Sequence, residues 1–212
     1  MPKRALIEKR PWLLASLIAG ISFYFIKDSA LPGIQMMAWK GAGVALLAVY
    51  ALVRHEGADS RQIAAVMGFG ALGDVLIELW LEAGAAAFLV GHLIAIQLYW
   101  RHRREALPAS QQLAALALLV LTPLVGWQLT GSLAVAGYAL GLGAMAASAW
   151  TSSFPRYRVG IGAVLFVASD LLIFARLGAL AQSPVPDLLI WPLYYFGQFL
   201  ICTGVIGELK RR

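Results

Sequence analysis

The sequence predicts an all-α integral membrane protein, a bundle of eight transmembrane helices with both termini in the cytoplasm. The prediction rests on an apolar composition, eight apolar runs of spanning length and a one-sided distribution of basic residues. Of the 212 residues, 60% are hydrophobic and 13% are charged, and the mean hydropathy is +0.75. Soluble domains usually contain about 45–50% apolar and about 25% charged residues, so this chain has too little polar surface to cover a soluble globule.

The eight runs follow one another with short connections. A transmembrane helix needs about 20 mostly apolar residues, and so little of the chain lies outside the runs that no separate soluble domain fits. We therefore expect residues 1–212 to form a single transmembrane domain. The runs cover residues 11–27, 34–53, 61–80, 83–101, 110–127, 130–150, 157–176 and 187–207.

The ends and interiors of these runs carry residues typical of membrane helices. Tryptophan prefers the headgroup level, and these Trp residues lie at the ends of runs: Trp12, Trp80, Trp100, Trp127, Trp150 and Trp191. In the third run, Gly68, Gly70 and Gly73 predict close helix packing, as do Gly137 and Gly141 in the sixth. Pro123 predicts a kink in the fifth run.

Basic residues divide between the two sides of the predicted bundle. The opposite side from the termini holds only Lys27 and Arg176, and Lys40 lies within a span. By the positive-inside rule, this asymmetry places both termini in the cytoplasm. The net charge of +6 thus indicates topology, and we expect no nucleic-acid partner. The side of the termini holds Lys3, Arg4, Lys9, Arg10, Arg54, Arg61, Arg101, Arg103, Arg104, Arg156, Arg158, Lys210, Arg211 and Arg212.

The first run has an alternative interpretation as a signal peptide that is cleaved near Asp28-Ser29-Ala30. The charges of Lys27 and Asp28 are unusual so close to a cleavage point, which favours a retained helix.

Five ionisable residues lie inside the predicted spans. A charge near the bilayer centre costs at least about 2.5–3.5 kcal/mol, so each such residue needs a partner or a task. At 1.5 Å per residue, several of these groups lie roughly 9–16 Å below the outer ends of their helices, and five helices therefore bring polar groups to one layer. The ionisable residues are Lys40, Asp74, Glu78, His92 and Asp170, and the eighth run adds Tyr194, Tyr195 and Gln198.

Asp74 and Asp170 are the candidate catalytic residues. One ammonium cannot neutralise two carboxylates, so we expect one carboxyl to stay protonated while Lys40 keeps the other ionised. An acid and a base would then lie side by side, although the sequence leaves open which aspartate is which. Packing is the alternative role for a single aspartate paired with Lys40, hydrogen bonding within the core is the alternative for His92, and Glu78 lies near the mouth, where water can solvate it.

No metal or organic cofactor is expected. The single Cys202 excludes an internal disulfide, and the few Cys and His residues lack the spacing of zinc ligands.

Four strings resemble the YhhN family of eight-helix membrane proteins, whose studied animal members are lysoplasmalogenases. They are Ala71-Leu-Gly-Asp74-Val-Leu, Ala87-Phe-Leu-Val-Gly-His92, Phe166-Val-Ala-Ser-Asp170-Leu-Leu and Tyr194-Tyr-Phe-Gly-Gln198-Phe-Leu-Ile. The resemblance runs from Lys40 to the C-terminus and lies in the order and spacing of the strings. Two residues depart from the family pattern: Gly41 follows Lys40 where Pro is common, and Ala95 stands where an aromatic residue often follows the Gly-His pair.

The resemblance implies hydrolysis of the vinyl ether bond of alkenyl lysophospholipids. The products are a fatty aldehyde and a glycerophospho-ethanolamine or glycerophosphocholine. This reaction needs a proton donor, a nearby anion and a positioned water, which two carboxyl groups can supply, as they do in glycoside hydrolysis. Asp74 and Asp170 would be catalytic, while Lys40, Glu78, His92, Ser169, Tyr194, Tyr195 and Gln198 would support them or bind substrate. The implied partners are a lysophospholipid and membrane lipid, and the implied location is the bacterial inner membrane.

Three other classes remain open. Buried Asp, Lys and His also build the relays of proton-coupled transporters, although no pair of broken helices is evident. An intramembrane aspartyl protease carries Gly-x-Gly-Asp, whereas Ala71 stands at the first glycine here. A lipid-binding protein without turnover would keep the same fold. The sequence leaves the oligomeric state, the physiological substrate and the head-group preference open.

Overall fold

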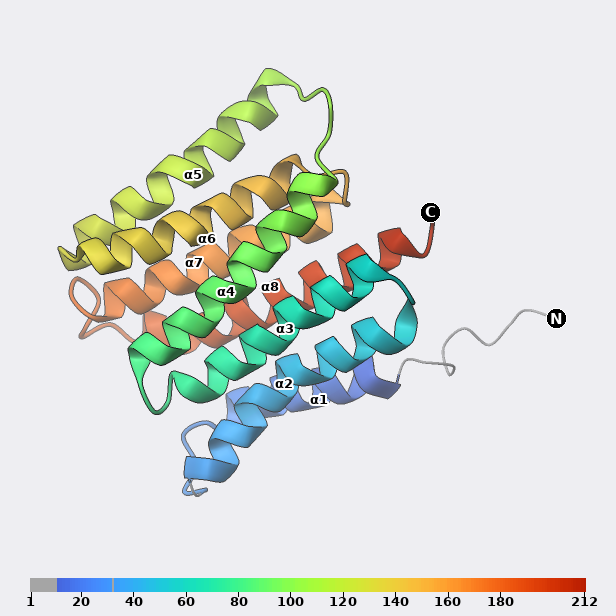
Figure 1. Ribbon diagram of the computed structural model, residues 1–212. Coiled ribbons are helices and arrows are strands. Elements are labelled where there is room, and N and C mark those ends of the chain that lie inside the picture. Colours follow the sequence, from blue (N-terminus) through green and yellow to red (C-terminus); the bar gives the residue numbers. More distant parts are fainter. Residues whose placement is uncertain (1–10, 32) are drawn as a thin grey trace.

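A computed structural model describes residues 11–31 and 33–212. This part of the chain forms eight α-helices, and a five-residue π-helical turn, Arg156–Gly160, leads directly into the seventh (Figure 1). The helices are α1 (Pro11–Ile26), α2 (Gly33–Arg54), α3 (Ala58–Leu76), α4 (Leu81–Arg101), α5 (Ala109–Thr130), α6 (Leu133–Thr151), α7 (Ile161–Arg176) and α8 (Val185–Leu209).

Each predicted apolar run corresponds to one of these helices, with ends that differ by a few residues. Six segments are long and apolar enough to cross a membrane: α2, α4, α5, α6, α8 and the π turn together with α7. The 16 residues of α1 make a shorter apolar helix. The 19 residues of α3 include Asp59, Arg61 and Asp74, which lower its hydropathy. The composition and these helices establish a multi-pass membrane protein.

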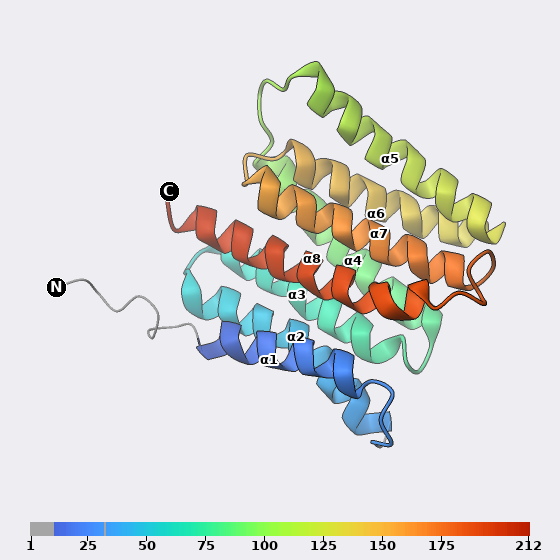
Figure 2. The same ribbon diagram turned by 180° about the vertical axis from the view of Figure 1, so that it is seen from behind.

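Helix α8 is the most widely connected helix in the bundle. It packs against α1, α2, α3 and α7, and Figure 2 shows it between α7 on one side and the α1–α3 group on the other. Helix α5 is peripheral, since among the described helices it packs only against α6 and α7 (Figure 1). Side chains on α8 therefore reach both halves of the bundle.

Two glycines bring α7 and α8 into backbone contact. A Cβ atom on Gly162 would lie 2.7 Å from the carbonyl oxygen of Gly197, and a Cβ on Gly197 would lie 2.8 Å from that of Gly162. Real Cβ atoms essentially never come so close to a backbone oxygen. Small residues permit this approach in membrane bundles, and the contact fixes α7 against α8 beside the polar residues described below.

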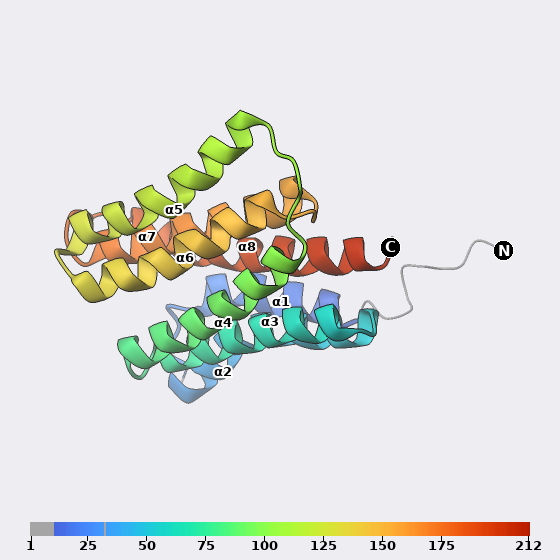
Figure 3. The ribbon, with the colours of Figure 1, turned by 45° about the horizontal axis from the view of Figure 1, so that its top comes forward.

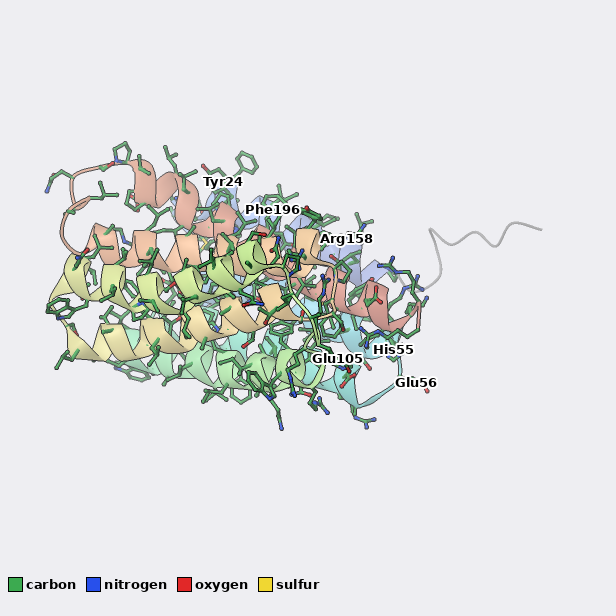
Figure 4. All side chains as sticks on the ribbon, turned by 90° about the horizontal axis from the view of Figure 1, so that it is seen from above. Tyr24, His55, Glu56, Glu105, Arg158 and Phe196 are labelled. Atoms are coloured by element: carbon green, nitrogen blue, oxygen red, sulfur yellow. The ribbon has the colours of Figure 1, made fainter. Side chains whose placement is uncertain are left out.

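Polar side chains tie together the end of the bundle where α1 begins and α8 ends. Arg101 donates a hydrogen bond to Asp59 over 3.1 Å, and Arg212 donates one to Ser153 over 2.7 Å. Figure 4 labels Glu105 towards the same end. We call this the basic end, because the predicted arginines of residues 54–212, apart from Arg176, lie on its loops and helix ends. Of the predicted topology signals, Lys3, Arg4, Lys9 and Arg10 lie outside the described residues.

The Gly162–Gly197 contact generates a prediction about stability. Gly197→Leu should lower the free energy of unfolding by about 1–3 kcal/mol, the usual cost of forcing extra carbon atoms into a packed interior. Thermal unfolding in detergent measures the change. Gly68→Leu is the matched control, because a Cβ at Gly68 meets nothing within 4 Å, contrary to the close packing predicted there. Equal midpoints for the two variants would show that the α7–α8 contact is not tight.

Candidate functional site

Asp74 on α3 is held by a tyrosine of α8. Its carboxyl is 2% exposed, and the Tyr194 hydroxyl donates a hydrogen bond of 2.8 Å to Oδ2. One turn earlier on α3, a Cβ on Gly70 would lie 2.8 Å from Nε2 of Gln198. The absence of a side chain at Gly70 thus lets the polar residues of α8 lie directly against α3.

Asp170 on α7 has a second tyrosine partner, from α6. The Tyr138 hydroxyl donates a hydrogen bond of 2.6 Å to Oδ2 of Asp170. Nε2 of His92 on α4 lies 3.3 Å from the same hydroxyl oxygen. Because a hydroxyl carries one hydrogen, and Asp170 accepts it, Nε2 of His92 is the donor in this arrangement. Three helices thus contribute one chain of hydrogen bonds from His92 through Tyr138 to Asp170.

Aromatic rings fill the space between the two carboxyl–tyrosine pairs. The ring of Phe166 lies 5.1 Å from that of Tyr194 and 5.1 Å from that of His92, measured between centroids. Phe88 contacts both Phe166 and Tyr194 in edge-to-face geometry. Phe166 therefore touches Tyr194 of the first pair and His92, which contacts Tyr138 of the second pair. The two carboxyl groups thus belong to one buried cluster.

Lys40 forms its ion pair with Glu78, not with Asp74 or Asp170 as the sequence predicted. The reason is geometric: Glu78 lies one turn beyond Asp74, where α3 ends, and its half-exposed side chain meets the lysine there. Lys40 still lies close enough to Asp74 for their charges to interact. The ion-pair partner of Lys40 is therefore Glu78, which was expected near the mouth, while the charge of the lysine also acts on Asp74.

The remaining predicted residues on α7 and α8 are buried. Ser169 donates a hydrogen bond of 2.9 Å to the carbonyl oxygen of Ile190, which ties α7 to α8. The Tyr195 hydroxyl lies 2.9 Å from that of Ser16 on α1, which in turn donates to the Gly43 carbonyl over 2.6 Å. Oε1 of Gln198 is buried and has no hydrogen-bond partner within residues 11–31 and 33–212. Tyr195 thus joins helices, whereas Gln198 leaves one acceptor free beside Tyr194.

Two cavities open on the end of the bundle opposite the basic end. The first, which we call the charged cavity, has a volume of about 770 Å³ and contains three cationic and three anionic side chains: Lys27, Lys40, Arg176, Asp28, Glu78 and Asp187. The second, which we call the apolar groove, has a volume of about 530 Å³ and is lined mainly by hydrocarbon, with Asp170 and Tyr138 among its walls. Ile77, Leu81 and Ile173 line both, so the cavities adjoin.

Within the described chain, no three His, Cys, Asp or Glu side chains gather closely enough to hold an ion.

The family model of the YhhN family matches residues 35–205. The chain belongs to the YhhN family. Two curated relatives are each 30% identical over 193 residues, covering 83% of this chain and 73% of their own length. They are the lysoplasmalogenases of Mycobacterium bovis and Mycobacterium tuberculosis. No solved structure matches.

Tyr138 is the site residue of this YhhN protein that the sequence reasoning missed. It lies between Gly137 and Ala139 in the sixth run, a stretch interpreted only as a packing surface. The sequence did contain a signal for Tyr138, since the hydroxyl of a tyrosine within a membrane span needs a hydrogen-bond partner. Ser16 on α1 was missed for a different reason, because serine is common in membrane helices and single serines carry little information.

The YhhN departures lie on α2 and α4. A Cβ on Gly41 would lie 2.8 Å from the Val75 side chain, so Gly41 lets α2 approach α3 next to Asp74. Ala95 is buried in the core. Of the two, Gly41 therefore changes the surroundings of the site.

The Lys40–Glu78 pair generates a second prediction. Because both side chains reach solvent, Lys40→Met and Glu78→Gln should each lower the free energy of unfolding by no more than about 1 kcal/mol. Thermal unfolding of the single and double variants measures this loss. Because the charge of Lys40 also acts on Asp74, the loss for Lys40→Met should be the larger of the two single losses. Equal losses would show that Glu78 is the only partner of the lysine.

Proposed function

We propose that this protein is a hydrolase that cleaves the vinyl ether bond of alkenyl lysophospholipids. Its relatives named lysoplasmalogenases support the reaction class. The observation that carries the proposal is Asp170, a carboxyl only 5% exposed that nevertheless lines an apolar groove. A buried acid at the wall of a hydrocarbon-lined groove is suited to donate a proton to an otherwise apolar part of a lipid.

The proposed topology has eight spans, with α1 and α3 completing the six long apolar helices. The basic end then faces the cytoplasm, by the positive-inside rule, and the membrane is the bacterial inner membrane. The charged cavity and the apolar groove open in the outer half of the bilayer. A lysophospholipid in the outer leaflet would have its head group at the depth of the charged cavity and its chain at the depth of the apolar groove.

The substrate fits across the boundary between the two cavities. The charged cavity offers both cations and anions to a zwitterionic head group, and the apolar groove offers hydrocarbon to the chain. The vinyl ether joins these two parts of the molecule. It would therefore lie near Ile77 and Ile173, each of which is one turn from a carboxyl, Asp74 and Asp170 respectively.

We assign the general acid to Asp170. Tyr138 donates to Oδ2, which leaves Oδ1 to carry a proton towards the groove. Transfer of this proton to the outer carbon of the double bond forms a C–H bond and leaves an oxocarbenium ion at the ether carbon. Asp74 in its ionised form would stabilise that cation, and the hydrogen bond from Tyr194 and the nearby charge of Lys40 both favour this form.

The same two carboxyl groups complete the reaction. Water adds to the ether carbon and gives one of its protons to Asp74. This addition converts the oxocarbenium ion into a hemiacetal. The hemiacetal hydroxyl then returns its proton to Asp170 while the glycerol oxygen leaves with the proton from Asp74. The products are a fatty aldehyde and a glycerol hydroxyl, and one water is consumed. Oε1 of Gln198, which has no hydrogen-bond partner among the described residues, would accept a hydrogen bond from that water.

The aspartates generate the third prediction. Asp74→Asn and Asp170→Asn keep the side-chain shape but remove the transferable proton or the anion, so each should reduce turnover by about 10²–10⁴-fold. Because both groups act on one transition state, the double variant should be little worse than either single variant. The assay is mass spectrometry of aldehyde released from an alkenyl lysophospholipid, beside its alkyl ether analogue.

Asp59→Asn is the matched control, an aspartate at the far end of the same helix α3 as Asp74. It should keep the wild-type rate. A folded, monodisperse Asp170→Asn protein that retains more than about a tenth of the activity would contradict the assignment. Uptake of a solute into liposomes without any aldehyde would instead favour a proton-coupled transporter.

Tyr138 generates the fourth prediction. Tyr138→Phe keeps the ring but removes the hydrogen bond to Asp170. This becomes a bond to a charged group, worth about 1.5–3 kcal/mol, as Asp170 gives up its proton in the transition state. We expect kcat to fall about 10–100-fold with KM nearly unchanged, because the hydroxyl acts through Asp170. A rise in KM at constant kcat would show that Tyr138 only contacts the substrate.

A further inference from the structure

The apolar groove runs between the first turns of α4 and α6. Its α4 edge includes Ala85 and Ala86, and its α6 edge includes Ala134 and Gly137. The residues Ala86, Ala134 and Gly137 are exposed at the surface of the bundle. Figure 1 shows the two helices diverging towards these ends, and Figure 3 shows them running side by side. The groove therefore has a side entrance that faces the surrounding lipid.

The residues that line the groove include a carboxyl oxygen without a hydrogen-bond partner among the described residues. Oδ1 of Asp170 makes no hydrogen bond with any described residue, since the one bond of this carboxyl goes from Tyr138 to Oδ2. Leaving a polar group unpaired in a hydrocarbon setting is costly. A side opening that ends on such a group indicates a ligand site rather than a packing gap.

We propose that this groove is the lateral entrance through which the hydrocarbon chain of a lysophospholipid enters from the bilayer. The proposal rests on the proposed function for the identity of the lipid. Two features favour such an amphiphile over a second helix or a second copy of the chain. The groove is almost entirely apolar, and at Ile77, Leu81 and Ile173 it adjoins a cavity with charges of both signs. An apolar helix bound in the groove would leave the charges of the adjoining cavity without a ligand.

Gly137 is the position at which the entrance can be narrowed. A Cβ built there meets nothing within 4 Å, so a larger side chain extends into the groove without displacing another residue. Ala134 lies on the same α6 edge. Gly68 on α3 gives a matched control, because its Cβ also meets nothing within 4 Å and it lines neither cavity.

The experiment uses an alkyl lysophosphatidylcholine with a diazirine near the end of its chain, which has no vinyl ether to cleave. Irradiation in lipid nanodiscs and peptide mapping should place the label within 85–89 and 134–138. Gly137→Leu should lower this labelling by about tenfold, the effect of about 1.4 kcal/mol of binding. Gly68→Leu should leave it unchanged. Ala134→Leu provides a second variant should Gly137→Leu fail to fold.

Each outcome separates the entrance from the reaction. Labelling at the groove in a protein that releases no aldehyde from alkenyl lipids would retain the entrance and overturn the hydrolase. Aldehyde release together with labels spread evenly over the lipid-facing helices, unchanged by Gly137→Leu and Ala134→Leu, would overturn the entrance and retain the hydrolase. Labels confined to α1 and α2 would place chain entry at the charged cavity and also overturn it.

Discussion

A carboxyl group buried among apolar helices must find its hydrogen-bond donor within the protein, and this constraint organises the bundle. The two intramembrane aspartates satisfy it in the same way, each with a tyrosine hydroxyl from a different helix. Tyr194 on α8 donates a hydrogen bond to Asp74 on α3, and Tyr138 on α6 donates one to Asp170 on α7. Since an unpaired charge at this depth is costly, these bonds fix how the helices are rotated about their axes.

The consequence for function is an asymmetry between two similar residues. Asp170 lines the apolar groove, whereas Asp74 lines neither the groove nor the charged cavity and has Lys40 within electrostatic reach. The sequence presents both as an aspartate after a small residue near the outer end of a helix. Their surroundings differ in charge and in access, and this difference supports the proposed division into an acid and an anionic base.

The fold was largely predictable, because bilayer thickness fixes the length of an apolar run and the runs are separated by charged or turn-forming residues. The positions of Asp74, Asp170 and Tyr194 along their helices were predictable for the same reason. Their partners were not, because depth does not specify the direction in which a side chain points. Lys40 was thus assigned to the aspartates rather than to Glu78, and Tyr138 was read as part of a packing surface.

The central claim is that Asp170 carries a proton on the oxygen that Tyr138 leaves free. Infrared difference spectroscopy in nanodiscs at neutral pH tests it directly, by comparing spectra in H₂O and D₂O. The account predicts a carbonyl band of a protonated carboxylic acid that shifts in D₂O, disappears in Asp170→Asn and moves to higher frequency in Tyr138→Phe. A wild-type spectrum without such a band, or the same band in Asp170→Asn, would contradict it.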